Sequence, residues 1–262
     1  MKPVVLALFL AGLAACGPVR QVKVAAPGPH IATVTVIAPQ FGDNHPNDAV
    51  GRLPLAYAVH GVDVSRYQSG VDWQMARGAG VNFAFIKATE GGDGFDPMFP
   101  SHWTHSRAAG VRRGAYHMFY HCRPASEQAR WFIGHVPRDA AALPPVLDME
   151  WTPTSPTCRI RRPAAEIRAE AQVFLSAIAR HYGRRPILYT APDFYDDNQL
   201  WRLSGVDFWL RSVAAPVGQR YPGRPWRFWQ YSGTGQVQGL PGKVDLNVFA
   251  GSAQDWAAFV AP

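Results

Sequence analysis

Short apolar runs alternate with amphipathic windows along most of the chain. Eight runs rich in β-branched and aromatic residues predict strands over residues 58–64, 83–89, 114–120, 145–149, 187–190, 208–213, 228–231 and 244–248. Between them, apolar residues at helical spacing predict helices over residues 73–79, 97–109, 125–135, 163–182 and 192–200. The fourth window is the clearest, because Pro163 suits a first helical turn and Gly183 suits a helix end.

This order of elements predicts an α/β fold. Strands that alternate with helices are typical of a parallel sheet with crossover helices. Eight strands within roughly 200 residues predict a closed, irregular (β/α) barrel. No clear helical window separates the last three strands, so we expect the barrel to close there without regular crossover helices. A length of 262 residues fits one such domain with an N-terminal extension.

The N-terminal extension has the pattern of an export signal. Lys2 precedes an apolar run over residues 4–13, and small residues lead to Cys16. The sequence Leu-Ala-Ala-Cys resembles the lipobox of bacterial lipoproteins, in which the cysteine is lipidated. We therefore expect a signal peptide over residues 1–16 and a lipoprotein that is exported and held at a membrane of the bacterial envelope. Gly17 is not aspartate, which allows the outer membrane in a host that has one. An ordinary signal peptide with an incidental cysteine is the alternative.

The segment after Cys16 is rich in Pro, Ala, Val and Gly and has no sustained period. It predicts a tether over residues 17–56 in front of a catalytic domain over residues 57–262. Residues 31–37 alternatively add an edge strand. The run at the N-terminus is too short to span a membrane comfortably, and no second long apolar stretch follows.

Composition and cysteine content narrow the function classes. The net charge is +7, but the arginines are scattered and form no long basic run, so a nucleic-acid partner is not expected. The positive charge is compatible with an anionic polymer such as cell wall. Nine Trp in a chain with 17% charged residues suggest an aromatic, carbohydrate-facing surface, although most Trp fill core. Cys122 and Cys158 are expected to form a disulfide after export, with two free thiols as the alternative. Neither cysteine has a partner at zinc spacing, so no metal or cofactor is expected.

A pair of acids ends the predicted strand at 145–149. Asp148 and Glu150 share one face, roughly 6–7 Å apart along the strand. Two like charges in a partly desolvated cleft cannot both ionise easily, so one pKa rises. The result is one proton donor and one carboxylate, as glycoside cleavage requires. A metal-binding or solvated strand end is the alternative interpretation of this pair.

Other strand ends supply more candidates. Asp63 ends the first predicted strand, and Asp245 lies in the last one. First and last strands are neighbours in a closed barrel, so all four acids are expected at one mouth. Aromatic and polar side chains near the same ends predict a sugar-binding trough: Tyr116, His117, Tyr189, Trp209, Trp229 and Tyr231. His117 is interpreted as a hydrogen-bonding cleft residue rather than as an acid or base, and Lys87 and Glu90 as an ion pair.

The same segments resemble glycoside hydrolase family 25, the Chalaropsis-type lysozymes, over nearly the whole predicted domain. The resemblance rests on motifs in the expected order: GVDVSRYQ at 61–68, FIKATEG at 85–91, GAYHMF at 114–119, LDME at 147–150, YT at 189–190, WQYS at 229–232 and GKVDLN at 242–247. It implies an irregular β/α barrel that cleaves the β-1,4 bond between N-acetylmuramic acid and N-acetylglucosamine without a metal. Glu150 is then the general acid. Asp148 orients the reacting N-acetyl group or acts as a base, and Asp63 and Asp245 position and tune them.

The chain departs from the family pattern at two places. Arg211 follows Phe208-Trp209-Leu210, where the family usually has a small residue or another strand-end group. It either binds a substrate carboxylate or forms a salt bridge to a neighbouring acid. The pair Cys122 and Cys158 is not a general family feature. The resulting expectation is a monomeric muramidase acting on peptidoglycan glycan strands, with a non-catalytic peptidoglycan-binding lipoprotein and a hydrolase of another polysaccharide such as chitin as alternatives.

Overall fold

The structure is a computed structural model that describes residues 34–51 and 53–261. The predicted signal peptide and the predicted lipidation site at Cys16 lie outside the described residues. Within the described ranges, no helix has the length and apolar character needed to cross a membrane.

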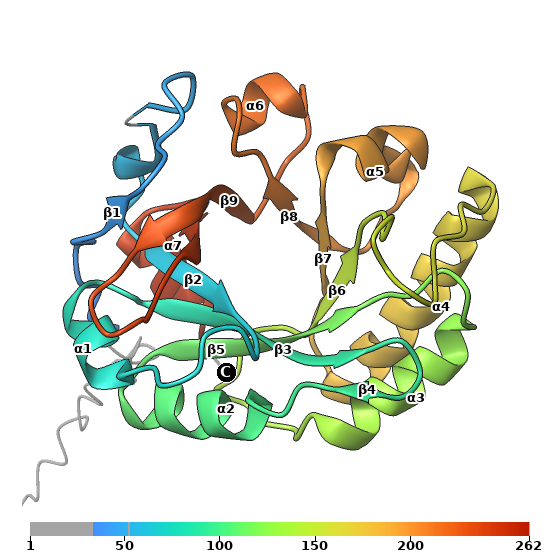
Figure 1. Ribbon diagram of the computed structural model, residues 1–262, viewed down its shortest axis with the longest axis horizontal. Coiled ribbons are helices and arrows are strands. Elements are labelled where there is room, and N and C mark those ends of the chain that lie inside the picture. The colour runs from blue at the N-terminus through green and yellow to red at the C-terminus, as the bar shows by residue number, and fades with distance from the viewer. Residues whose placement is uncertain (1–33, 52, 262) are drawn as a thin grey trace, which may run out of the picture. The chain divides into compact units, whose positions relative to one another are not determined.

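Eight strands form a closed barrel (Figure 1). In chain order they are β2 (His60–Val64), β3 (Phe83–Glu90), β5 (Arg112–Met118), β6 (Val146–Met149), β7 (Ile187–Thr190), β8 (Asp207–Arg211), β9 (Phe228–Gln236) and β10 (Val244–Phe249). Neighbours from β2 round to β9 run parallel. β10 runs antiparallel to both β9 and β2 and closes the barrel. The predicted irregular α/β barrel is confirmed, including its β-only closure. A short strand β4 (Gly94–Phe95) pairs with β3.

Helices cover the outside of the parallel strands. They are α1 (Trp73–Gly78), α2 (Phe99–Ala108), α3 (Ala125–His135), α4 (Ala164–Tyr182), α5 (Pro192–Asp197), α6 (Val217–Arg220) and α7 (Ala253–Phe259), with 3-10 turns η1 (Leu53–Ala56) and η2 (Leu200–Arg202). All five predicted helices are present within a few residues. Helices α6 and α7 were not predicted, although Ser252 and Asp255 form a capping box that marks the start of α7.

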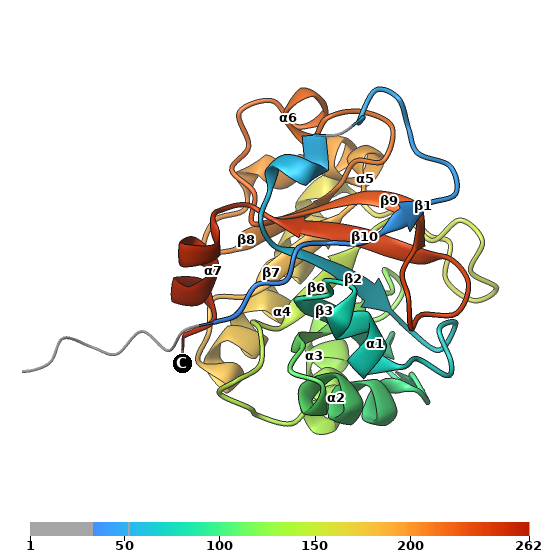
Figure 2. The same cartoon turned by 90° about the vertical axis from the view of Figure 1, so that its left-hand side faces the viewer.

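Two cores follow from the alternation of side chains along each strand. One face of each strand points outward, and on the parallel strands it packs against helices, as Leu147 and Met149 do on β6. The other face fills the barrel, where the rings of Phe85 and Trp209 stack with centroids 4.5 Å apart. The rings of Trp256 of α7 and Phe83 pack together, with centroids 5.5 Å apart. Helix α7 lies at the end of the barrel where β2 begins (Figure 2). The interior of the barrel is therefore closed at that end by apolar side chains and opens at the opposite end, where the parallel strands finish.

The described part of the predicted tether packs on the barrel, so the tether prediction is wrong for residues 34–51 and 53–56. Strand β1 (Gly42–Asp43) pairs with β9 (Figure 1). The Ile37 main-chain N–H donates to Asn82 Oδ1 at 2.9 Å, and Phe41 and Val50 pack in the outer core. The added edge strand therefore lies at 42–43 and not at 34–37. This segment covers Tyr231 and Leu246 on the outer face of β9 and β10, which have no crossover helix between them.

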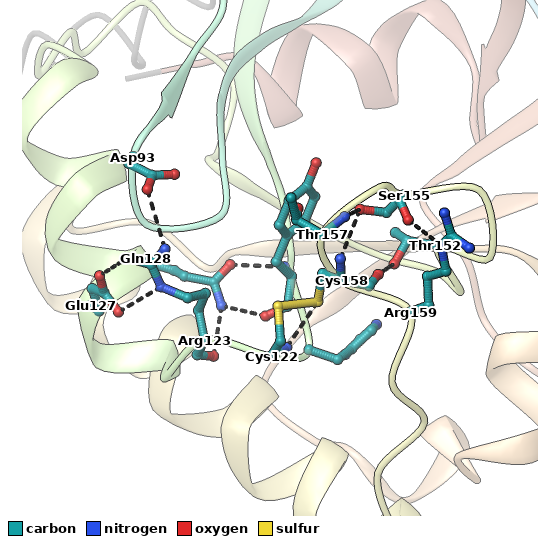
Figure 3. Close-up of a disulfide and its surroundings, with 12 residues drawn as sticks. Asp93, Cys122, Arg123, Glu127, Gln128, Thr152, Ser155, Thr157, Cys158 and Arg159 are labelled. Atoms are coloured by element: carbon teal, nitrogen blue, oxygen red, sulfur yellow. Dashed lines mark hydrogen bonds and ion pairs between the residues drawn. A yellow bond between two sulfur atoms is a disulfide. The ribbon is translucent and has the colours of Figure 1, made fainter.

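A disulfide joins two loops at the strand ends. Cys122 follows β5, Cys158 lies in the loop between β6 and α4, and the two are bonded (Figure 3). The Thr152 hydroxyl donates to the Cys158 carbonyl at 2.7 Å, and Gln128 holds the main chain on both sides of Cys122 through Tyr120 and Arg123. The loop that begins at Glu150 is thus tied to the loop that follows β5.

Candidate active site

Four acids line one pocket of about 300 Å³ at the open end of the barrel. They are Asp63 of β2, Asp148 of β6, Glu150 just after β6, and Asp245 of β10. The remaining lining consists of Ser65, Tyr67, Lys87, Tyr116, Met118, Tyr189, Trp209, Arg211 and Gln230. The predicted convergence of the four acids is therefore present in the structure.

Strand alternation explains why these side chains meet. Val62 and Val64 pack in the outer core, so Asp63 between them points into the barrel. Leu147 and Met149 do the same for Asp148, and Glu150 continues the inward row. β10 runs in the opposite direction, so Asp245 at its beginning reaches the same end as the acids at the ends of the parallel strands.

Asp63 is held by two side-chain amides. Gln230 Nε2 and Asn247 Nδ2 both donate to Asp63 Oδ2, at 2.9 and 2.8 Å. The Trp209 indole N–H donates to Asn247 Oδ1 at 2.8 Å, and the Tyr189 hydroxyl donates to Gln230 Oε1 at 2.9 Å. An indole N–H can only donate, so Asn247 must turn its NH2 group toward Asp63. Two aromatic residues of the pocket thereby set the amides that orient the Asp63 carboxyl group.

The four carboxyl groups have raised pKa values. Burial is the largest cause for each of them. The pKa of Asp63 is raised further by Asp245 and that of Asp148 by Glu150, whereas the two amides oppose the rise at Asp63. The pKa of Asp245 rises to about 6, with Arg211 opposing the rise. Arg211 and Lys87 also oppose the rise at Glu150. The carboxyl groups of the pocket therefore keep their protons to higher pH than exposed carboxyl groups do, which favours acid catalysis by one of them.

Asp148 has an unsatisfied carboxyl oxygen. Its Oδ1 atom is buried and has no hydrogen-bond partner among the described residues. Leaving a buried polar atom unpaired costs about 1–3 kcal/mol. A bound ligand that donates an N–H or O–H group there would recover part of that energy.

Replacing Asp148 by asparagine is expected to stabilise the fold. The folded-state pKa of Asp148 is raised by burial and by Glu150. The contribution of Asp148 to the free energy of unfolding is therefore full below its unfolded pKa, near pH 4, and is lost as the pH rises toward the folded pKa. At pH 7 the buried carboxyl group thus costs the folded state free energy, and the neutral amide of the Asp148→Asn variant removes that cost. We expect the variant to gain about 1 kcal/mol or more in stability, and each kcal/mol raises Tm by about 2–4 °C. Thermal unfolding from pH 4 to 8 measures it, with exposed Asp48→Asn as the control. An equal Tm difference at pH 4 and pH 7 would contradict this origin.

Glu150 is fixed through its main chain. The His121 ring Nε2 donates to the Glu150 carbonyl at 3.0 Å, and burial lowers the pKa of His121. A carbonyl only accepts, so His121 carries its proton on Nε2. Trp151, the next residue, packs edge-on against His121 and Phe194, which stack on each other. His121 directly precedes Cys122, so the disulfide also fixes the residue that holds the main chain of Glu150, the general-acid candidate.

The structure places three of the predicted trough residues elsewhere. His117 is fully buried in the outer core, bonded to Thr89 and Gln128 and stacked on Phe174, and burial lowers its pKa to about 4. The Trp229 indole donates to the Ser212 carbonyl, away from the pocket. Tyr231 lies beneath the N-terminal segment, 3.4 Å from His60 Nδ1. The prediction of a cleft position is wrong for these three because successive side chains of a strand point to opposite faces. His117 follows the inward-pointing Tyr116, and Trp229 and Tyr231 flank the inward-pointing Gln230, so all three point outward.

Four predicted residues do line the pocket, namely Tyr116, Tyr189, Trp209 and Arg211. Gln230 and Asn247 were not predicted as site residues. Neither was Tyr67, whose side chain lines the pocket and is 76% exposed. An exposed aromatic ring beside a row of acids is the signal that identifies Tyr67 as a sugar-stacking candidate. The predicted ion pair between Lys87 and Glu90 is present.

In residues 34–51 and 53–261, no group of three or more His, Cys, Asp or Glu side chains has the arrangement needed to hold a metal ion. The observed chemistry of the pocket is that of carboxyl groups, amides and aromatic rings.

Comparison with known proteins places the pocket in a family context. The family model of glycosyl hydrolases family 25 matches residues 62–240, a range that includes Asp63, Asp148 and Glu150 and ends before Asp245. The chain is 40% identical to the uncharacterized protein YegX of Escherichia coli K12 over 217 residues, which cover 80% of this chain and 76% of YegX. It is 33% identical to lysozyme M1 of Streptomyces globisporus over 264 residues, 95% of this chain and 87% of that protein.

A solved structure is similar as well. A family 25 glycosyl hydrolase from Bacillus anthracis superposes with a TM-score of 0.73 at 34% sequence identity, covering 83% of this chain and 99% of the other. The similarity therefore extends over most of this chain and nearly all of the other.

Proposed function

Because the chain belongs to glycoside hydrolase family 25, we propose that it is a lysozyme that hydrolyses the β-1,4 bond between N-acetylmuramic acid and N-acetylglucosamine in peptidoglycan. The observation that carries the proposal is the meeting of Asp148 and Glu150 with Asp63 and Asp245 in one pocket, with raised pKa values. Two of the relatives that support this substrate are an N,O-diacetylmuramidase from Chalaropsis and a bacterial lysozyme from Streptomyces coelicolor.

Glu150 is proposed as the general acid. Its side chain is half-buried at the mouth, whereas Asp148 lies deeper. A proton donor must reach the glycosidic oxygen of a bound chain, which favours the more accessible carboxyl group. The raised pKa keeps Glu150 protonated further toward neutral pH than an exposed glutamate. It then donates its proton to the leaving oxygen as the glycosidic bond breaks.

Asp148 is proposed to orient the N-acetyl group of the reacting sugar. The acetamide N–H is a donor of the kind that the unpaired Oδ1 atom lacks. Two further acids are proposed to set the charge around Asp148 and Glu150. They are Asp63, which Gln230 and Asn247 hold in place, and Asp245. The aromatic rings of Tyr67 and Tyr116 supply faces for pyranose rings.

Product analysis tests this function. The protein is incubated with purified sacculi, and the soluble products are reduced and analysed by mass spectrometry. A muramidase leaves a reducing N-acetylmuramic acid end. A reducing N-acetylglucosamine end, or cleavage of chitin oligomers in preference to sacculi, would instead support a different glycosidase. Binding to sacculi without any new reducing end would support the non-catalytic alternative.

We further propose that the protein acts outside the cytoplasm as a monomer anchored by lipid at Cys16. The support is the Leu-Ala-Ala-Cys sequence and the extracellular location of the cell-wall substrate. The Cys16→Ser variant is expected to lose membrane association and incorporation of labelled fatty acid. A membrane-bound, lipid-labelled Cys16→Ser product would refute the anchor while leaving the hydrolase proposal untouched.

A further inference from the structure

Arg211 points into the pocket from the end of β8. Phe208 and Leu210 pack in the outer core and Trp209 packs in the barrel, so the alternation turns Arg211 inward with Trp209. Its main chain is fixed, because the carbonyl of Arg211 accepts a hydrogen bond from the Tyr221 hydroxyl at 2.8 Å and β8 pairs with β9 at Gln230. The guanidinium thus extends from a rigid strand end into the acid-lined space.

The guanidinium is not engaged in an ion pair. The ion pairs within the described residues involve other arginines and Lys87, and none of them joins Arg211 to a carboxylate within 4.0 Å. The predicted salt bridge to a neighbouring acid is therefore not formed. Lys87, the other cationic side chain of the pocket lining, is buried and donates to Glu90. Arg211 is half-buried and remains accessible from the mouth.

The pocket carries more acidic than basic side chains, so an anionic substrate requires a free cation there to bind. Four acids face two cations there, so an anionic substrate meets repulsion as soon as the acids ionise. Muramic acid carries a lactyl carboxyl group, which is either free or linked to a stem peptide that has carboxylates of its own. A guanidinium binds a carboxylate with two parallel hydrogen bonds, and such charge-assisted bonds are stronger than neutral ones.

We propose that Arg211 is a specificity-determining residue that binds a carboxylate of the muramyl unit, either its lactyl group or its stem peptide, and so favours peptidoglycan over neutral N-acetylglucosamine polymers. This inference rests on the proposed muramidase function. It differs from a purely electrostatic role, in which Arg211 only lowers the pKa of Glu150 and Asp245. The electrostatic role is independent of the substrate's charge, whereas carboxylate binding depends on it.

The test compares charged and neutralised substrates. Glycan strands are stripped of peptides with an amidase, and half of the sample has its lactyl carboxylates converted to methylamides. A second pair consists of peptide-bearing strands with their carboxylates free or amidated. The variants are Arg211→Gln, Arg211→Lys and, as a control for loss of one positive charge outside the pocket lining, Arg220→Gln. The readout is kcat/KM for release of reducing ends across pH 4–8.

Arg211→Gln is expected to lose roughly tenfold to hundredfold in kcat/KM on the substrate whose carboxylate it binds, and less than about threefold on the matched neutral substrate. Arg211→Lys should recover part of the loss. A loss confined to the peptide-bearing pair assigns the stem peptide, and a loss on stripped strands assigns the lactyl group. Equal losses on charged and neutral strands, together with a shifted pH profile, would overturn the proposal in favour of the electrostatic role, as would no loss at all.

A binding measurement separates this inference from the proposed function. In a Glu150→Gln background, calorimetry gives the Kd of the same four substrates with and without Arg211→Gln. A wild-type protein that cleaves none of them refutes the muramidase proposal, yet a charge-dependent change in Kd would still support Arg211 as the carboxylate site. If the wild-type protein cleaves sacculi but Arg211→Gln changes the Kd of charged and neutral substrates equally, only the inference about Arg211 is refuted.

Discussion

The Glu150→Gln variant is expected to lose about 10²–10⁴-fold in turnover on sacculi while it keeps its fold, because the amide cannot protonate the leaving oxygen. Glutamine has nearly the same size, and the Glu150 main chain stays held by His121. The loss should therefore appear in kcat, with KM changed little. Release of reducing ends gives kcat and KM, and thermal unfolding reports the fold.

Glu166→Gln is the matched control. Glu166 lies exposed in the first turn of α4, paired with Arg162 and outside the pocket lining. It should retain wild-type turnover. Full activity of Glu150→Gln on purified sacculi would remove Glu150 from its role and leave Asp148 as the remaining candidate acid of the pair.

Removal of the disulfide is expected to have the largest effect on stability. The bridge closes a loop with a sequence separation of 36, for which chain entropy gives about 3–4 kcal/mol. The Cys122→Ser, Cys158→Ser double variant should therefore unfold about 6–16 °C below the wild type. Chemical denaturation of both proteins, oxidised and reduced, measures the free energy of unfolding. If reductant leaves the wild-type value unchanged, the bridge does not contribute in this way.

Activity should also fall in the double variant, even well below its unfolding temperature. Cys122 is the neighbour of His121, which holds the Glu150 carbonyl, and Thr152 bonds to the Cys158 carbonyl. Loosening these loops leaves Glu150 less well positioned toward the glycosidic oxygen, and misplacement of about 1 Å costs on the order of 10²-fold in rate. Unchanged kcat at 20 °C would show that the bridge stabilises the fold without positioning Glu150.

The eight barrel strands, the helices α1 to α5 and the four acids could be predicted from the sequence because their signals are local. Apolar residues at period two or at helical spacing mark each element, and β7 and α3 were predicted with the observed bounds. Asp148 and Glu150 sit two positions apart, so they share a face whichever side of the strand lies inside. Asp63 and Asp245 pair across β2 and β10, and closure of the barrel brings them into the same pocket.

Only the closed barrel decided which face of each strand points inward. His117, Trp229 and Tyr231 each neighbour an inward residue, and a one-residue change of parity moves a side chain from the pocket to the outer core. The amides that hold Asp63, the packing of residues 34–51 on the barrel and the freedom of Arg211 from ion pairs depend on contacts between distant segments. Periodicity reports on neighbours along the chain and carries no information about such contacts.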